Sequence, residues 1–433
     1  MLARLERYFG FAAHETTWRT EILAGLTTFI TMAYIIFVNP EILSQTGMPL
    51  AAVTTSTCLC AAIGSILMGA LANYPLALAP GMGLNAYFTY TVVKGMGVPW
   101  QTALGAVFIS GVIFLLLTVG GIRQKLVAAI PHQLHAAVAG GIGLFIAFIG
   151  LRNAGIIVPS AATTVTLGNL HAHGTQLAIF GIVLIAVLQA YRVRASMLIG
   201  VLATLAAGIL LHQVKYAPST FNPMAIRDTL FHLDIRGALK MNALEIIFVF
   251  LFVDLFDNIG TLVAVTERAG LIADDHTIPR LDKIFFADAT STVIGSLAGT
   301  STVTSYIESS AGVAAGGRTG VTAIVTGLLF LVAIFVAPVV GAIPDFATAP
   351  ALILVGALML GGAARIDWLE PRVAIPAFLT LITIPLTYSI ATGLSFGLIG
   401  YAVLELATGR GRRQHWMLYL LAVLFLLRFI YIA

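Results

Sequence analysis

Stretches of about twenty apolar residues follow one another along almost the whole chain, and this pattern restricts the fold more than any other feature. Hydrophobic residues make up 59% of the 433 positions and charged residues only 10%, against about 25% charged residues in an average soluble domain. A helix of about 20 apolar residues is long enough to cross the hydrocarbon core of a bilayer. The sequence therefore predicts an all-α polytopic membrane protein.

Fourteen such stretches fall into two groups of seven. We place them near residues 20–38, 50–71, 76–93, 101–120, 132–151, 175–190, 195–212, 242–265, 283–298, 300–316, 318–337, 347–363, 371–390 and 393–408. A further apolar run, Trp416–Ile432, either crosses the membrane or lies at its interface.

The polar segment 213–240 separates the two groups. It divides the chain into a first repeat (1–212), an outer linker loop (213–240) and a second repeat (241–433). Because seven is an odd number, the second group enters the membrane from the opposite side. This arithmetic predicts two inverted repeats.

The distribution of basic residues predicts the orientation, because cytoplasmic loops carry the excess of Lys and Arg. With the N-terminus inside, the inner segments hold sixteen of these residues and the outer segments six. No cleavable signal peptide is evident. We expect a multi-pass protein of the cell (inner) membrane with a cytoplasmic N-terminus. The formal charge of +4 then follows from topology, and nucleic acid is not an expected partner.

The tenth stretch contains a polar island, GTSTVTSYIESSAG at residues 299–312. Its β-branched first half favours extended chain, and its small residues from about Tyr306 favour a closely packed helix. Such broken backbone is tolerated at membrane depth only where protein buries it or where it lines a cavity. We expect a short strand followed by a half-helix, with Glu308 near the positive end of that half-helix.

The third stretch has the same character. Pro75 and Pro80 disfavour helix ahead of Gly81, while Gly81 and Gly83 allow close approach of backbone or ligand. We again expect a short strand followed by a half-helix. The two glycines do not form a nucleotide-binding motif, because the third glycine and the preceding strand pattern are missing.

Four carboxylates lie clearly within predicted spans, all in the second half: Asp254, Asp257, Asp288 and Glu308. Asp254 and Asp257 share one helix face, which Thr261 continues four residues later. Ionisable residues inside a membrane are costly and mark functional sites by default. Beside a broken helix they favour a polar cavity.

Other reactive residue types carry no site. Cys58 and Cys60 lie within an apolar span, where they act as small packing residues. His171 and His173 could hold a metal, but a solvated polar turn is the better interpretation. We expect no metal, no cofactor and no catalytic residue.

Three motifs carry a resemblance that covers essentially the whole chain: APGMGLNAYF at 79–88, FVDLFDNIGTL at 252–262 and TSTVTSYIESS at 300–310. With these motifs the chain resembles the nucleobase/cation symporters, and within them the AzgA-like adenine, guanine and hypoxanthine permeases. The resemblance implies fourteen spans in two inverted sevens. It also implies a substrate-binding core domain (spans 1–4 and 8–11) and a gate domain (spans 5–7 and 12–14), through which a homodimer could form.

The resemblance also assigns roles to residues. Asp257 and Glu308 match the two substrate carboxylates of the family, and Asn85 matches its span 3 asparagine. Substrate contacts are therefore expected at Asn85, Thr261, Asp257, Tyr306 and Glu308. Asp288 matches a supporting aspartate, and it is grouped with Asp254 as a proton-coupling or supporting residue.

The tenth span departs from the uracil and xanthine branches of the family. Ser309 replaces an asparagine there, and both Gly312 and Arg318 are displaced by one position. The departure favours purine bases. Buried carboxylates and an amide can bind the edges of such a base while apolar groups cover its faces.

We expect import of adenine, guanine or hypoxanthine by proton symport, because burial favours the protonated form of a carboxylate and no sodium site is recognisable. The partners are then the purine base, the proton and membrane lipid. Three alternatives remain: an anion carrier of the same fold for sulfate or bicarbonate, an intramembrane aspartyl hydrolase that uses Asp257 with Glu308 or Asp288, and a channel.

Overall fold

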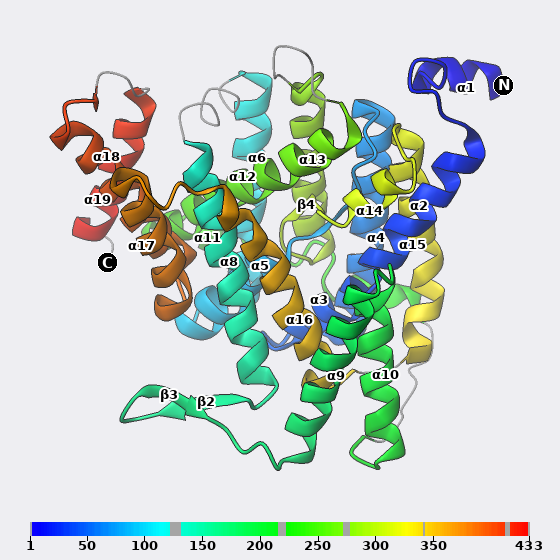
Figure 1. The fold of residues 1–433 in the computed structure, drawn as a ribbon, viewed down its shortest axis with the longest axis horizontal. Coiled ribbons are helices and arrows are strands. Elements are labelled where there is room, and N and C mark those ends of the chain that lie inside the picture. The colour runs from blue at the N-terminus through cyan, green and yellow to red at the C-terminus, as the bar shows by residue number, and fades with distance from the viewer. Residues whose placement is uncertain are drawn as a thin grey trace.

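The computed structural model describes residues 2–121, 131–214, 222–271, 278–340, 343–411 and 416–431. Most of this part of the chain is helical (Figure 1). The helices of the first half are α1 (Leu2–Phe9), α2 (Trp18–Met32), α3 (Ile35–Ser44), α4 (Leu50–Leu67), which the π-helix η1 (Met68–Ala72) continues, α6 (Trp100–Val119), α8 (His132–Asn153), α9 (His173–Ala190) and α10 (Ser196–Leu210).

The second half begins with the long helix α12 (Met241–Ala269) and ends with α19 (Trp416–Tyr431). Between them lie α13 (Leu281–Ala298), α15 (Gly320–Val340), α16 (Asp345–Leu360) with the 3₁₀ turn η4 (Gly361–Arg365), α17 (Pro371–Thr387) and α18 (Ile390–Ala407). The predicted linker contains η3 (Pro223–Asp228) and α11 (Ile235–Ala238).

Eight helical stretches in the described residues are long and apolar enough to cross a membrane, and four shorter apolar helices accompany them. The prediction of a mostly helical, multi-pass membrane protein is confirmed. The exposed hairpin of β2 (Ile157–Ser160) and β3 (Thr164–Leu167) follows α8 and projects beyond the helices (Figure 1).

Two short strands from distant parts of the chain meet near the middle of the molecule. β1 (Leu78–Pro80) pairs antiparallel with β4 (Val303–Ser305), with Ala79 opposite Thr304. Backbone hydrogen bonds from Tyr306 to Ala77 and from Gly81 to Thr302 extend the pairing. Each strand leads into a short helix, and both strands are completely buried.

The short helix after β1 is α5 (Met82–Ala86), which continues as the π-helix η2 (Tyr87–Gly95). The short helix after β4 is α14 (Ser309–Ala314), and Glu308 is its N-cap residue. The predicted order of strand and then helix is confirmed for both segments. α14 starts three residues later than expected, because extended backbone and a turn continue through Glu308.

The helices pack in two groups. The crossing bundle surrounds β1 and β4 and consists of α2, α3, α4, α6, α12, α13 and α15. The flanking bundle consists of α8, α9, α10, α16, α17 and α18. Glycines permit close contact within each group. A Cβ on Gly320 would lie 2.0 Å from the carbonyl oxygen of Gly69, and one on Gly356 would lie 2.3 Å from that of Gly143.

The first predicted span is not one continuous helix. α2 ends at Met32 and α3 begins at Ile35, so the helix breaks at Ala33 and Tyr34, and it extends to Ser44 instead of 38. Pro40 lies one to two turns beyond the break; it lacks an N–H donor and crowds the preceding turn. A hydropathy window measures the length of a span and does not register such a break.

The C-terminal run forms α19, which packs against α18 of the flanking bundle. Phe425 contacts Phe248 and Phe252 on α12 of the crossing bundle. The guanidinium of Arg428 donates to the Glu245 carboxylate on α12, with an Nε to Oε1 distance of 2.7 Å. It also donates to Ser395 Oγ on α18 at 3.4 Å. α19 therefore joins one helix of each bundle.

Candidate functional site

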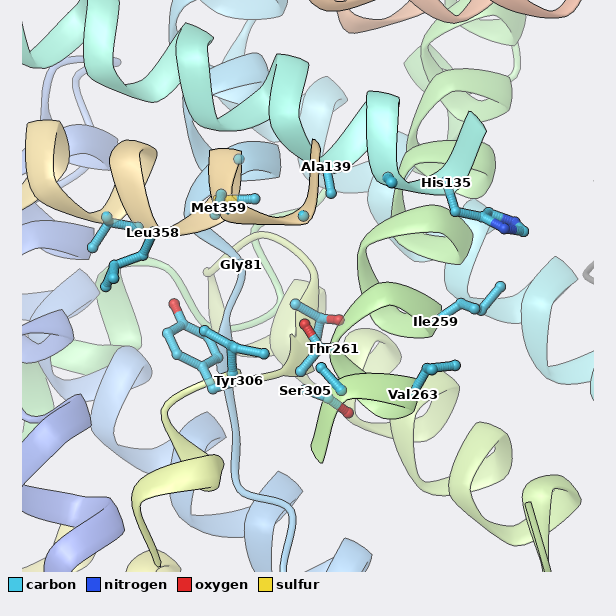
Figure 2. Close-up of a pocket in the computed structure, with 18 of the residues that line it drawn as sticks. Gly81, His135, Ala139, Ile259, Thr261, Val263, Ser305, Tyr306, Leu358 and Met359 are labelled. Atoms are coloured by element: carbon cyan, nitrogen blue, oxygen red, sulfur yellow. The ribbon is translucent and has the colours of Figure 1, made fainter. Parts of the chain in front are cut away.

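A cavity of ≈ 580 Å³ lies between the two bundles, beside the crossing of β1 and β4. Figure 2 shows Gly81, Ser305 and Tyr306 from the crossing facing Leu358 and Met359 of α16 and Ala139 of α8. Residues of α5, α8, α12, α16 and η4 complete the lining. This volume suits a small organic molecule.

The turn between β4 and α14 places a carboxylate at the cavity. Glu308 Oε1 accepts a hydrogen bond from the Tyr34 hydroxyl at 2.6 Å. Tyr34 is completely buried and sits at the break between α2 and α3. The hydroxyl therefore holds one oxygen of Glu308 in place, while the carboxylate still lines the cavity.

Two hydroxyl groups of β4 also line the cavity. Thr304 and Ser305 are 1% and 3% exposed, and neither Thr304 Oγ1 nor Ser305 Oγ has a hydrogen-bond partner among the described residues. A buried polar atom without a partner is costly. These two atoms are therefore suited to hydrogen-bond a molecule in the cavity.

The other walls are mostly apolar. Met82, Ile146, Ile259, Val355 and Met359 supply hydrocarbon or thioether surface. Tyr306 adds an aromatic ring, and its hydroxyl donates to the Pro80 carbonyl at 2.5 Å. A flat ring can be covered by such walls while its edge contacts the polar groups of β4.

The cavity reaches the surface where α16 ends. Leu358 is 53% exposed, Gly361 is exposed, and the Arg365 side chain is 58% exposed. Arg365 forms an ion pair at 3.8 Å with Glu267, whose side chain is also solvent-exposed. A pair of this kind contributes little to stability. At the opposite end the lining residues Gly81, Thr304 and Ser305 are buried.

Three of the predicted substrate contacts line the cavity: Thr261 from α12, and Tyr306 and Glu308 from the turn after β4. Gly81 and Gly83, which the sequence also singled out, line it as well. Asn85 does not line it. The Asn85 amide donates to Asn39 Oδ1 and accepts from Ser301, and Asn39 also donates to Thr57 Oγ1 at 2.7 Å. This buried network joins α3, α4, α5 and the segment before β4. A contact between Asn85 and substrate stays a prediction that this conformation does not display.

Three aspartates were also predicted to act at the site. Asp257 lies on α12, but its side chain is outside the described part of the structure. Asp254 and Asp288 are completely buried on α12 and α13 and do not line the cavity. Their expected roles in substrate binding or proton coupling stay predictions.

Several residues of the site were missed from the sequence: Thr304, Ser305 and His135, which line the cavity, and Tyr34, which hydrogen-bonds Glu308 without being among the lining residues. Tyr34, Thr304 and Ser305 stand in apolar or Thr-rich surroundings that give no individual signal. His135 lines the cavity from α8, and its ring lies 5.0 Å from that of Phe256. A histidine at the start of an apolar stretch, just after Pro131, was the available clue for it.

Paired discontinuous spans that cross beside a polar cavity are the arrangement by which secondary transporters bind substrate near the membrane midplane. The fold and the site thus define the class of protein, a membrane transporter and not an enzyme. The chain belongs to the Permease family, whose model matches residues 19–396. The resemblance to the AzgA-like purine permeases is confirmed by its relatives.

The relatives match over nearly their full lengths. The chain is 53% identical to a Methanocaldococcus jannaschii protein named as a permease, with 99% of both chains covered. It is 45% identical to adenine permease AdeP of Escherichia coli K12, covering 99% of this chain and 96% of AdeP. It is 46% identical to guanine/hypoxanthine permease PbuG of Bacillus subtilis, covering 99% of this chain and 100% of PbuG.

A solved structure shares the fold at low sequence identity. The transmembrane domain of the cyanobacterial bicarbonate transporter BicA matches with a TM-score of 0.63 at 14% identity, covering 88% of this chain and 98% of that domain. At this identity the match shows the fold alone.

Proposed function

We propose that the protein imports purine nucleobases, namely adenine, guanine or hypoxanthine, across the cytoplasmic membrane by proton symport. The full-length similarity to an adenine permease and to a guanine/hypoxanthine permease supports the substrate class. The observation that carries the proposal is the chemistry of the cavity. It combines the Glu308 carboxylate and two buried hydroxyls, which have no hydrogen-bond partner in the described part of the chain, with apolar walls.

A purine base fits this chemistry because it is flat and uncharged, with N–H donors and ring acceptors on its edges. Glu308 can accept from an N–H donor, and the hydroxyls of Thr304 and Ser305 can donate or accept. Hydrogen bonds to a charged group contribute roughly 1.5 to 3 kcal/mol each. A few such bonds are enough to hold a small base without a cofactor.

The roles of the site residues follow from this proposal. Glu308, Tyr306 and Thr261 contact the base, with Asp257 and Asn85 as further ligands. Glu308 and Asp257 are the leading candidates to bind the coupling proton, and Asp254 and Asp288 are the reserves or support the site. Substrate and proton would then enter together, so that the loaded site carries less net charge when it moves.

The proposed architecture has fourteen spans in two inverted repeats. In it the crossing bundle is the substrate-binding core and the flanking bundle is the gate, through which a homodimer forms. The charge count supports a cytoplasmic N-terminus. Arg365, at the open end of the cavity, belongs to a segment that this count assigns to the cytoplasm, so this conformation would be open to the inside.

Competition for uptake tests the substrate. Purified protein in liposomes should take up labelled hypoxanthine, and unlabelled adenine or guanine should compete whereas uracil should not. Uracil that competes as well as the purines would overturn the proposal. Sulfate and bicarbonate belong in the same panel, because an anion carrier shares this fold. Competition by either anion would favour that second function.

Coupling needs its own experiment. Uptake is measured with an imposed pH gradient, with and without a protonophore, and with sodium replaced by choline. We expect the protonophore to abolish accumulation and choline to leave it unchanged. Uptake that ignores the protonophore and stops without sodium would contradict proton symport.

A further inference from the structure

The end of the interface opposite the mouth of the cavity is closed by packed side chains. α8 and α16 run antiparallel there. A Cβ on Gly143 would lie 2.7 Å from the Gly356 carbonyl oxygen, whereas one on Gly150 would lie 3.0 Å from that of Ala349. Because the mouth lies where α16 ends, the last turns of α8 lie at the opposite end. Ile149 is 2% exposed there and does not line the cavity.

The turn between α17 and α18 lies at this closed end, where Tyr388 contacts α8. Its φ of +53° is in the left-handed region, which residues other than glycine adopt rarely. The ring packs edge-on against Phe145 and Phe148, with a centroid distance of 5.5 Å to each. Arg152, in the last turn of α8, donates to the Tyr388 hydroxyl at 2.9 Å. α8 therefore holds both the ring and the hydroxyl of Tyr388, and with them the turn.

The backbone of the same turn binds the other bundle. Thr91 lies on η2, which packs on α3, α5 and α6. Its Oγ1 donates a hydrogen bond to the Tyr388 carbonyl at 2.5 Å. Carbonyl groups at the end of a helix lack an intrahelical donor, so a side-chain hydroxyl can bind this one. Tyr388 is thus held by the flanking bundle through its side chain and by η2 through its carbonyl.

Two longer hydrogen bonds join the bundles at the same end. Asn153 Nδ2 of α8 donates to the Tyr90 hydroxyl of η2 at 3.4 Å. Thr348 Oγ1 of α16 donates to Glu41 Oε2 of α3 at 3.5 Å. Both distances exceed those usual for hydrogen bonds. The Thr91 contact is therefore the strongest of the three.

We propose that the Thr91 hydroxyl and the Tyr388 carbonyl form a latch that keeps this end closed, and that Arg152 is a positioning residue that holds Tyr388 in the latched position. A transporter exposes its site to the two sides of the membrane in turn. The cavity is open at one end here, so the bundles must separate at the other end to admit a molecule from the second side. Tyr388 then moves with α8 and Thr91 with η2, and their hydrogen bond breaks, whichever molecule is carried.

A thiol reporter tests this proposal. Ala351 is completely buried on α16, one turn after Thr348, whose hydroxyl contacts α3. Ala351→Cys is introduced with Cys58 and Cys60 replaced by Ala, and its rate of labelling by a maleimide is measured in the purified protein. Thr91→Val then removes the donor of the latch at nearly constant shape. Thr91→Ser keeps a hydroxyl at the same position and is the matched control.

Thr91→Val should raise the labelling rate at residue 351 roughly three- to ten-fold, as expected for the loss of one hydrogen bond that stabilises the closed state. Thr91→Ser should stay within about two-fold of the parent. Tyr388→Phe keeps the ring but loses the bond from Arg152, so it should raise the rate by less than Thr91→Val. The double variant Thr91→Val with Tyr388→Phe should be labelled no faster than Thr91→Val alone, because both changes act through one latch.

A second reporter separates opening of this end from loosening of the whole fold. Ala323 is completely buried on α15, and Ala323→Cys should be labelled at the same slow rate with and without Thr91→Val. Three results would overturn the latch: an unchanged rate at residue 351 in Thr91→Val, an equal rise in Thr91→Ser, or a parallel rise at residue 323. The experiment requires no bound base, so it decides the role of Thr91 even if the proposed substrate is wrong.

Discussion

The two strand–helix elements at the centre of the molecule pair with each other, yet they contribute different chemistry. β1 and α5 carry no ionisable side chain, and they bring the backbone of Gly81 and Gly83 to the cavity. β4 and the turn before α14 bring two hydroxyls and the Glu308 carboxylate. The first element allows a bound molecule to approach the backbone closely, and the second provides hydrogen-bonding side chains.

This difference shows how a pair of similar backbones can form an asymmetric site. The first element must keep glycine at position 83, because a Cβ there would meet Ile142 of the flanking bundle. The second must keep polar side chains, because they would bind the edge of a flat substrate. Substitutions in the first element should therefore disturb packing and lower stability. Substitutions in the second should lower the affinity for substrate.

The largest effect is expected for Glu308→Gln. It removes a charged acceptor, so base affinity should fall by about 2 kcal/mol or more while folding is retained. Calorimetric titration with hypoxanthine measures the change. Glu267→Gln, an exposed carboxylate on α12, is the control and should bind like the parent. Unchanged affinity in Glu308→Gln would place the binding site elsewhere.

Gly83→Ala tests the first element. The new Cβ would lie 2.5 Å from Ile142 Cγ2 on α8, and overpacking of this kind costs typically about 1 to 3 kcal/mol. We expect a lower thermal midpoint, which the second substitution Ile142→Ala should restore. At Gly174 an added Cβ makes only ordinary contacts, so Gly174→Ala should be neutral. No rescue by Ile142→Ala would mean that the clash is not the cause.

Tyr34→Phe should produce a smaller loss of affinity than Glu308→Gln, of about 1 kcal/mol, because it deletes only the hydrogen bond that orients Glu308. The double variant should bind no worse than Glu308→Gln alone, since the two residues act as a unit. A double-mutant cycle on hypoxanthine affinity measures this coupling. Additive losses would separate Tyr34 from the role of Glu308.

Ser305→Ala should have the smallest effect on binding, about 0.5 to 1.5 kcal/mol, and an opposite effect on stability. Ser305 Oγ has no partner among the described residues, so its removal should leave the thermal midpoint unchanged or raise it. Ser301→Ala deletes the bond to Asn85 and should instead lower the midpoint. A stability loss in Ser305→Ala would mean that its hydroxyl already has a structural partner.

Local sequence rules were sufficient for the membrane class and for the two strand–helix elements. Prolines before Gly81 and β-branched residues before Tyr306 determine backbone conformation through their immediate neighbours. Glu308 was identifiable because a carboxylate within an apolar stretch is rare and costly. Such signals can be read without any knowledge of packing.

The partners of these residues could not be read in the same way. Tyr34 and Glu308 are 274 positions apart, and they meet only because the first span breaks at Tyr34. Asn85 has the same polar character whether it faces a cavity or a buried network. Its hydrogen bonds to Asn39 and Ser301 depend on how three spans pack, which no local pattern encodes.

The C-terminal helix has a mechanical consequence. Through Arg428, α19 holds Glu245 of one bundle and Ser395 of the other. A rigid body that is pinned at one point can pivot about that point, but it cannot translate along its whole length. While these contacts persist, displacement between the bundles is smallest beside α19 and grows with distance from it. With these contacts in place, any motion of one bundle relative to the other would be a rotation about a point near α19.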